Sequence, residues 1–297
     1  MMGVSGMLTR RSVLLGAAAL AACAGEVPGR KRLAITMDDF AVPEDATLAM
    51  ERDARIRAHL PRQAAAFVNA QYRIRPAFDD VLAAWAADGH IIANHGFRHL
   101  WASRHPVDAV TQDIARNHRA LADRPGFQPY FRFPFLDEGK DHAQKLAYLR
   151  WLREAGYTPA PVTIDTVDWN VTNRLSGANP DAVRSAWLDI VSAEARYAHA
   201  LALALGYRDL PHQMLVHHNA LNALCLGDLL DRLRDEGWEV IDAKTALDFA
   251  PYAQDPPEID GWGNWLSVRR QARGLRNPER PSILRDFGNP AMDARGL

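Results

Sequence analysis

The stretch Leu33-Ala34-Ile35-Thr36-Met37-Asp38-Asp39 is a short apolar run that ends in two acidic residues. A nearly continuous apolar run of this length is typical of a strand that is buried in a sheet. We therefore expect a strand over residues 33–37 whose carboxyl end carries Asp38 and Asp39.

Strand and helix patterns alternate along the chain. The predicted strands or extended segments cover 64–68, 91–93, 129–134, 158–164, 213–216 and 239–241, and the predicted helices cover 48–60, 78–87, 107–121, 143–155, 182–205 and 221–234. Such alternation predicts an α/β fold with a parallel sheet or barrel, and its functional residues should lie at the carboxyl ends of the strands.

The amino terminus has the pattern of an export signal. Arg10 and Arg11 precede an apolar run from Val13 to Ala22, which is shorter than the roughly 20 residues of a membrane-spanning helix. The segment around the two arginines resembles a twin-arginine signal, and Leu20-Ala21-Ala22-Cys23 resembles a bacterial lipobox. We expect lipidation at Cys23, with ordinary cleavage after Ala24 as the alternative, and in either case an exported protein of the cell envelope or periplasm.

Overall composition limits the classes of partner, and local changes in composition divide the chain into segments. The 297 residues are 48% hydrophobic and 24% charged, with a net charge of -1, which is typical of a globular protein and gives no case for nucleic-acid binding. No obligate protein partner is evident. The predicted division is a signal peptide over 1–22, an anchor and linker over 23–31, a main domain over 32–250, and a Pro- and Arg-rich extension over 251–297.

The extension combines prolines with arginines and two tryptophans. Trp262 and Trp265 suggest that its first part packs on the main domain. We expect the basic stretch that includes Arg269 and Arg270 to form a solvated helix face.

Acidic and histidine residues follow two of the predicted strands. Asp38 and Asp39 are adjacent, so at a strand end they point in different directions. His95 and His99 are four residues apart, so one helical turn would bring both imidazoles to one face. Either pair alone has an ordinary explanation, as turn acids or as chance spacing. Together, one carboxylate and two imidazoles predict a divalent metal site.

Five short motifs resemble those of the polysaccharide deacetylases with NodB homology, carbohydrate esterase family four, in the order of that family. They are Thr36-Met37-Asp38-Asp39, His95-Gly96-Phe97-Arg98-His99, Arg132-Phe133-Pro134-Phe135, Asp165-Thr166-Val167-Asp168-Trp169 and Leu215-Val216-His217. The resemblance runs from about residue 32 to residue 249. It implies a distorted (β/α) barrel of the NodB type with fewer than eight full units.

The resemblance also implies a metal centre and a base. Asp39, His95 and His99 would hold a divalent metal, usually zinc in such enzymes. Asp38 would be the general base that takes a proton from the attacking water, and Arg132 would pair with Asp38 and keep it ionised.

The remaining motif residues would bind the substrate and protonate the product. The backbone N–H of Phe135 would help to stabilise the oxyanion, and Trp169 and Leu215 would form the walls of the acetyl pocket. His217 would protonate the leaving amine, with Asp168 holding its imidazole.

The function implied is a metal-dependent hydrolase that removes N-acetyl groups from an envelope or extracellular polysaccharide, such as peptidoglycan or a chitin-like N-acetylhexosamine. Two departures leave alternatives open. Phe40 stands where the family usually has glycine, and a long helical segment covers about 178–211. A bulky Phe40 ring would reshape the cleft floor or re-aim Asp39, and the helical segment would cover one side of the groove. Phe40 favours a related amidohydrolase acting on a small non-sugar C–N bond. An inactive glycan-binding lipoprotein is the third alternative.

Overall fold

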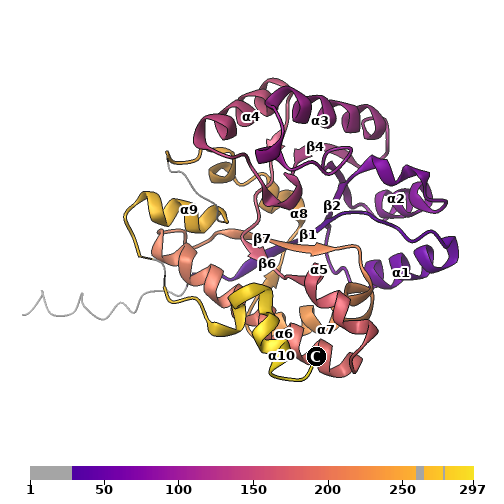
Figure 1. Cartoon of the computed structure of the whole chain (residues 1–297), viewed down its shortest axis with the longest axis vertical. Coiled ribbons are helices and arrows are strands. Elements are labelled where there is room, and N and C mark those ends of the chain that lie inside the picture. The colour runs from indigo at the N-terminus through magenta and orange to yellow at the C-terminus, as the bar shows by residue number, and fades with distance from the viewer. Residues whose placement is uncertain (1–28, 259–263, 277) are drawn as a thin grey trace, which may run out of the picture.

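A curled parallel sheet forms the centre of the protein, which a computed structural model describes over residues 29–258, 264–276 and 278–297 (Figure 1). Its strands are β1 (Arg32–Asp38), β2 (Ala65–Val68), β3 (Ile91–Asn94), β4 (Phe127–Phe131), β5 (Thr158–Pro159), β6 (Ile164–Asp165), β7 (Pro211–His217) and β8 (Glu239–Val240). The order is β5-β4-β3-β2-β1-β7-β6, with β8 also paired to β1 and every pairing parallel. All strand carboxyl ends therefore meet at one edge of the sheet, as predicted.

Helices surround the sheet and connect its strands (Figure 1). The longer ones are α1 (Ala46–Ala58), α2 (Phe78–Ala87), α3 (Val107–Leu121), α4 (His142–Glu154), α6 (Pro180–Ala204) and α7 (Ala220–Asp235). Side-chain caps set several starts: Asp45 accepts from the Leu48 N–H and Asn219 from the Asn222 N–H, which satisfies amide groups that have no partner inside the helix. The predicted α/β barrel with fewer than eight full units is confirmed.

The prediction of a single strand over 158–164 is wrong. The segment forms two short strands, of which β5 pairs with β4 and β6 pairs with β7. Pro159 and Pro161 lack the N–H that a continuing ladder requires, so the chain leaves the sheet between them. Within the described residues no pairing joins β5 to β6, and the barrel is open at this point.

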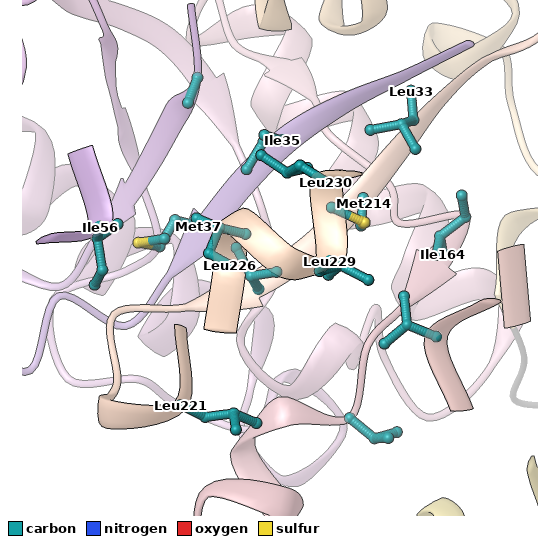
Figure 2. Close-up of a cluster of buried hydrophobic side chains, with 14 of the residues drawn as sticks. Leu33, Ile35, Met37, Ile56, Ile164, Met214, Leu221, Leu226, Leu229 and Leu230 are labelled. Atoms are coloured by element: carbon teal, nitrogen blue, oxygen red, sulfur yellow. The ribbon is translucent and has the colours of Figure 1, made fainter. Parts of the chain in front are cut away.

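The core lies between the sheet and its helices. Leu33, Ile35 and Met37 of β1 are fully buried or nearly so. Leu226, Leu229 and Leu230 of α7 lie over them (Figure 2). This packing fixes β1 in the middle of the sheet, so the position of Asp38 at its end is firmly set.

The carboxyl-terminal extension folds onto the barrel through α9 (Trp265–Ala272) and α10 (Asn289–Asp293). Trp265 lines a small cavity together with residues 159–162, so α9 covers the opening between β5 and β6. Trp262 and residues 1–28, including Cys23, lie outside the described residues. Among the helices that the structure does describe, none has the length and apolar character needed to span a membrane.

The expectation of a solvated arginine face is wrong for Arg269 and Arg270, whereas Arg273 and Arg276 are exposed as expected. Arg269 is 9% and Arg270 6% exposed. The Arg269 guanidinium stacks on the Trp265 ring at 3.8 Å and donates to the Gln254 carbonyl, and Arg270 donates to the Arg276 carbonyl. Long arginine side chains can pack their apolar stems while their charged heads find acceptors, which explains this burial.

Candidate active site

The loops at the carboxyl edge of the sheet have an unusual backbone. Asp39, His99, Phe135, Leu136 and Val167 are non-glycine residues with positive φ angles, between 47° and 59°. Left-handed conformations are disfavoured for such residues, and for a β-branched residue such as Val167 they are exceptional. Strain of this kind gathers at functional sites because the surrounding structure must hold it in place.

The three predicted metal ligands converge at this edge. Asp39 Oδ1 lies 2.9 Å from His99 Nε2 and 3.3 Å from His95 Nε2. One ligand atom from each of the three residues lies within 4.8 Å of the others. The two histidines come from the loop after β3 and the aspartate from the end of β1, as the sequence predicted.

Hydrogen bonds prepare this triad for a cation. His95 Nδ1 lies 2.9 Å from the Arg132 carbonyl oxygen. A carbonyl only accepts, so Nδ1 carries the proton and the Nε2 lone pair faces Asp39. Asp39 Oδ1 is buried and accepts no hydrogen bond of its own. An oxygen without a donor, beside two imidazole nitrogens, fits a divalent cation such as zinc.

The electrostatic surroundings of Asp39 also favour a role as a metal ligand. Burial alone would raise the pKa of Asp39, but the imidazoles of His95 and His99, in their protonated form, outweigh burial and hold that pKa well below its usual range. Asp39 is therefore ionised at neutral pH, as a metal ligand must be.

Asp113 of α3, which the sequence analysis missed, holds the loop that carries both histidines. Its buried carboxylate accepts the backbone N–H groups of Phe97 and Arg98 at 2.7 and 3.1 Å, and the Arg98 side chain at 2.8 Å. Gly96 has a φ of 72°, and a Cβ there would meet Asp113 Oδ2 at 3.2 Å. Only its place on the inward face of a predicted helix could have pointed to Asp113.

Asp38 is buried and paired with Arg132. Arg132 Nη1 donates to Asp38 Oδ1 at 2.9 Å and to Thr36 Oγ1 at 2.6 Å. The same guanidinium donates to the Ala160 carbonyl and to Gln213 Oε1. Because all three nitrogens of the guanidinium have acceptors, Arg132 is fixed in place, and it fixes Asp38.

His217 and Asp168 form a second buried pair. His217 Nδ1 lies 2.7 Å from Asp168 Oδ1, and the His217 backbone N–H donates to Asp168 Oδ2 at 2.7 Å. Asn219 and Asn222 also donate to Asp168 Oδ2. Burial alone would lower the pKa of His217, but Asp168 outweighs it and raises the pKa to about 10. His217 is therefore a cation at neutral pH with its Nε2–H free of Asp168.

The predicted substrate residues divide into exposed and buried ones. Phe135 is 45% exposed and stacks on Trp101 at 3.8 Å, while Trp169 is 42% exposed. Leu215 is buried at the end of β7. His218, the neighbour of His217, points to the opposite face, where its Nε2 lies 3.3 Å from Asp53 Oδ1.

Phe40 does not form the cleft floor, contrary to the expectation from sequence. Its ring is fully buried and packs against Trp85 at 4.9 Å and His218 at 5.0 Å. The strand ends at Asp38, and the positive φ of Asp39 turns the chain so that Phe40 enters the core. The Phe40 ring is therefore part of the core.

Comparisons with known proteins agree with this geometry. A family model described as polysaccharide deacetylase matches residues 25–159. A search of curated proteins finds no significant match.

Several solved structures share the fold. A mutant of a carbohydrate esterase family-four pseudoenzyme from Bacillus anthracis, with restored enzymatic activity, is 15% identical over 75% of this chain and 69% of its own, with a TM-score of 0.51. The Bc1960 peptidoglycan N-acetylglucosamine deacetylase is 18% identical over 74% and 90%, with a TM-score of 0.51. A polysaccharide deacetylase from Bacillus cereus is 20% identical over 72% and 92%, with a TM-score of 0.50.

At these identities the solved structures show the fold alone, and the family match covers the part of the chain from which Asp38, Asp39, His95, His99 and Arg132 come. Residues 25–159 of this chain are therefore similar to the polysaccharide deacetylase family, and its fold is similar to that of a carbohydrate esterase family-four protein.

Proposed function

We propose that this protein is a metal-dependent deacetylase that removes N-acetyl groups from an envelope or extracellular polysaccharide. The observation that carries the proposal is the presence of three separate groups of polar side chains at one edge of the sheet. These are a triad suited to a cation, a carboxylate paired with arginine, and an imidazolium paired with a carboxylate. Asp38 and His217 are register partners on β1 and β7, so the base and the acid stand side by side.

The proposed base is Asp38. A divalent cation held by Asp39, His95 and His99 would act as a Lewis acid that polarises the acetyl carbonyl and makes a water molecule more acidic. Asp38 would accept the proton of the attacking water. The charge-assisted bond from Arg132 holds the Asp38 carboxylate in position for this step.

The proposed acid is His217. Its Nδ1 is held by Asp168, so Nε2–H is the group that can donate a proton to the departing amine nitrogen. Amide hydrolysis needs this proton because an amine anion is a very poor leaving group. A positioned acid of this kind contributes roughly a hundredfold to ten-thousandfold in rate.

Substrate and location are proposed from the exposed aromatic rings and from the amino terminus. Phe135 lies beside His99 and Trp169 directly follows Asp168. Both aromatic side chains are exposed, as a site for sugar rings requires. The export pattern over residues 10–23, with lipidation at Cys23, would place the domain in the envelope, where acetylated glycans occur. The Phe40 ring, which favoured a small amide, is buried in the core and no longer supports that alternative.

Acetate release tests the proposal. The purified protein, loaded with zinc, is incubated with chitin oligomers and with peptidoglycan fragments, with and without a chelator. We expect acetate release that the chelator abolishes and that added zinc restores. A protein that holds about one zinc per chain and releases no acetate from any of these glycans would contradict the proposed activity and favour a glycan-binding role.

A further inference from the structure

The carboxyl-terminal extension contacts the segment that carries Asp168, the partner of the proposed acid His217. Asn170, in the short helix α5 (Asp168–Val171), donates to the Phe287 carbonyl at 3.2 Å and to Asn289 Oδ1 at 2.9 Å. Arg174 also donates to Asn289 Oδ1, at 3.0 Å. Residues 287–289 are therefore bonded to the loop that supplies Asp168.

These contacts place Phe287 next to Trp169. The two rings lie 5.2 Å apart at an interplanar angle of 66°. Phe287 is 53% and Trp169 42% exposed. Within the described residues, the large exposed apolar side chains include three aromatic rings, namely Phe135, Trp169 and Phe287. Two of them are substrate residues predicted from the motifs, and the third comes from the extension.

The backbone at Phe287 resembles that of the active-site loops. Asp286 and Phe287 have φ angles of 43° and 53°. Within the described residues, the other non-glycine positions with positive φ are the five in the catalytic loops. The next residue, Gly288, has a φ of 81°, and a Cβ there would meet Ile190 Cδ1 at 2.7 Å. Packing against α6 thus holds this turn in a disfavoured conformation that leaves the Phe287 ring exposed.

We propose that Phe287 and Trp169 form a carbohydrate subsite, in which the C–H face of a pyranose ring packs on the two aromatic rings. This inference rests on the proposed function and extends it to the binding of a glycan chain. The face of an aromatic ring is electronegative, and the axial C–H groups of a sugar carry partial positive charge, so the two surfaces attract while both lose contact with water. Because Trp169 directly follows Asp168, which binds His217, this subsite lies on the side of the active site that holds His217.

The turn offers a clean variant for a test. Phe287→Gly removes the ring, and glycine adopts a positive φ without strain, so the fold should be kept. Phe287→Tyr retains the ring. Leu275→Ala is the matched control, since Leu275 is a 39% exposed side chain in the same extension, and none of the contacts to Asn170 or Arg174 involves it.

Steady-state kinetics are measured on a hexamer of N-acetylglucosamine and on vinyl acetate, which has no sugar. In Phe287→Gly we expect KM for the hexamer to rise about fivefold to tenfold, with a much smaller change for vinyl acetate. Phe287→Tyr and Leu275→Ala should retain the KM of the wild type. An unchanged KM for the hexamer in Phe287→Gly would overturn the subsite.

Calorimetric titration with the hexamer separates this inference from the proposed function. If the wild type releases no acetate, the proposed deacetylase activity fails, and the titration still tests the subsite. Weaker binding by Phe287→Gly than by the wild type would then support it, and equal binding or no binding by both would overturn it.

Discussion

Asp38 and Asp39 are neighbours in sequence but differ in burial and in partners. The Asp38 side chain is 3% exposed and bonded to Arg132, whereas that of Asp39 is 30% exposed and faces two imidazoles. We expect Asp38→Asn to keep the metal and to lower kcat by roughly a hundredfold to ten-thousandfold, because only the proton acceptor is lost. Asp39→Asn should lose metal together with activity. Elemental analysis beside steady-state kinetics measures both effects.

Asp80→Asn, an exposed carboxylate on α2, is the control for loss of one negative charge and should match the wild type. Full metal content in Asp39→Asn together with an empty Asp38→Asn would reverse the two proposed roles.

The bond from Asp168 to His217 predicts a defined change in the pH profile. Burial lowers the pKa of His217, but Asp168 raises it to about 10. The acid must be protonated to act, so activity should fall as pH rises through this pKa. Asp168→Asn removes the largest of the charges that raise the pKa of His217, so burial should lower this pKa even though Asp38 and Asp39 still raise it. The alkaline limb of the kcat/KM profile should therefore move to lower pH.

A bound cation lowers the pKa of His217 in the wild type and in the variant alike, so the difference between their profiles is the quantity to compare. An alkaline limb that stays in place in Asp168→Asn would show that it belongs to another group.

At the residue scale, the sequence predicted chemistry better than orientation. The motif residues Asp39, His95 and His99 meet as the family resemblance indicated. The expected helical turn between the two histidines is wrong, because the segment is a loop in which Gly96 and His99 have positive φ angles. The direction of Phe40 could not be predicted, because it depends on room in the core beside Trp85 and His218. Asp113 was missed because two of its three hydrogen bonds come from backbone N–H groups, which leave no trace in the pattern of side chains, and the third joins it to Arg98, 15 residues away.

At the element scale, the loop between β3 and α3 depends on Asp113. The carboxylate binds two N–H groups between the two histidines, so it fixes the distance between them. We expect Asp113→Ala to weaken zinc binding about tenfold to a hundredfold, the usual effect of removing a group that orients ligands. Zinc titration with a competing chelator measures this, and cobalt substitution should show altered d–d bands.

Asp123→Ala, an exposed aspartate just beyond α3, is the matched control and should bind zinc as the wild type does. Asparagine at position 113 retains one carbonyl oxygen as acceptor, so Asp113→Asn should recover part of the affinity. Wild-type affinity in Asp113→Ala would show that packing alone holds the loop.

Elements with a strong local signal were the ones predicted well. The apolar spacing and the Asp-Gly stop placed α2 at its observed bounds, and the buried run placed β1 within one residue at each end. The prediction of one strand over 158–164 was wrong because composition reports only local strand preference. The division into β5 and β6 depends on tertiary contacts, since β5 pairs with β4 and β6 pairs with β7. Proline at two positions was the available sign of that split.

At the scale of the whole molecule, the extension completes a barrel that its strands leave open. Trp265 covers the opening between β5 and β6, and α10 packs against α6 near the carboxyl terminus (Figure 1). Sequence patterns predicted that the extension starts by packing down, but not that Arg269 and Arg270 are buried. These two arginines donate to the carbonyl groups of Gln254 and Arg276, and such contacts arise only in the folded chain.

The metal centre also predicts the stability of the whole molecule. Its ligands come from two loops that only the folded sheet brings together, so a cation binds the native state in preference to the unfolded chain. Zinc at a hundred times its Kd should add about 2.7 kcal/mol to the free energy of unfolding. For a domain of this size, that raises Tm by about 5–10 °C. Thermal unfolding with zinc and with a chelator measures the shift, and His95→Ala should abolish it.

This shift should depend on pH because protons compete with the cation for the histidines. Burial lowers the pKa of His95, but Asp38, Asp39 and the Arg132 carbonyl outweigh burial and raise the pKa above its usual value. His95 must be neutral to bind, so competition begins at a higher pH than for an unperturbed histidine, and the shift in Tm should be larger at pH 8 than at pH 6. An equal shift at both pH values, or one that persists in His95→Ala, would place the stabilising cation elsewhere on the protein.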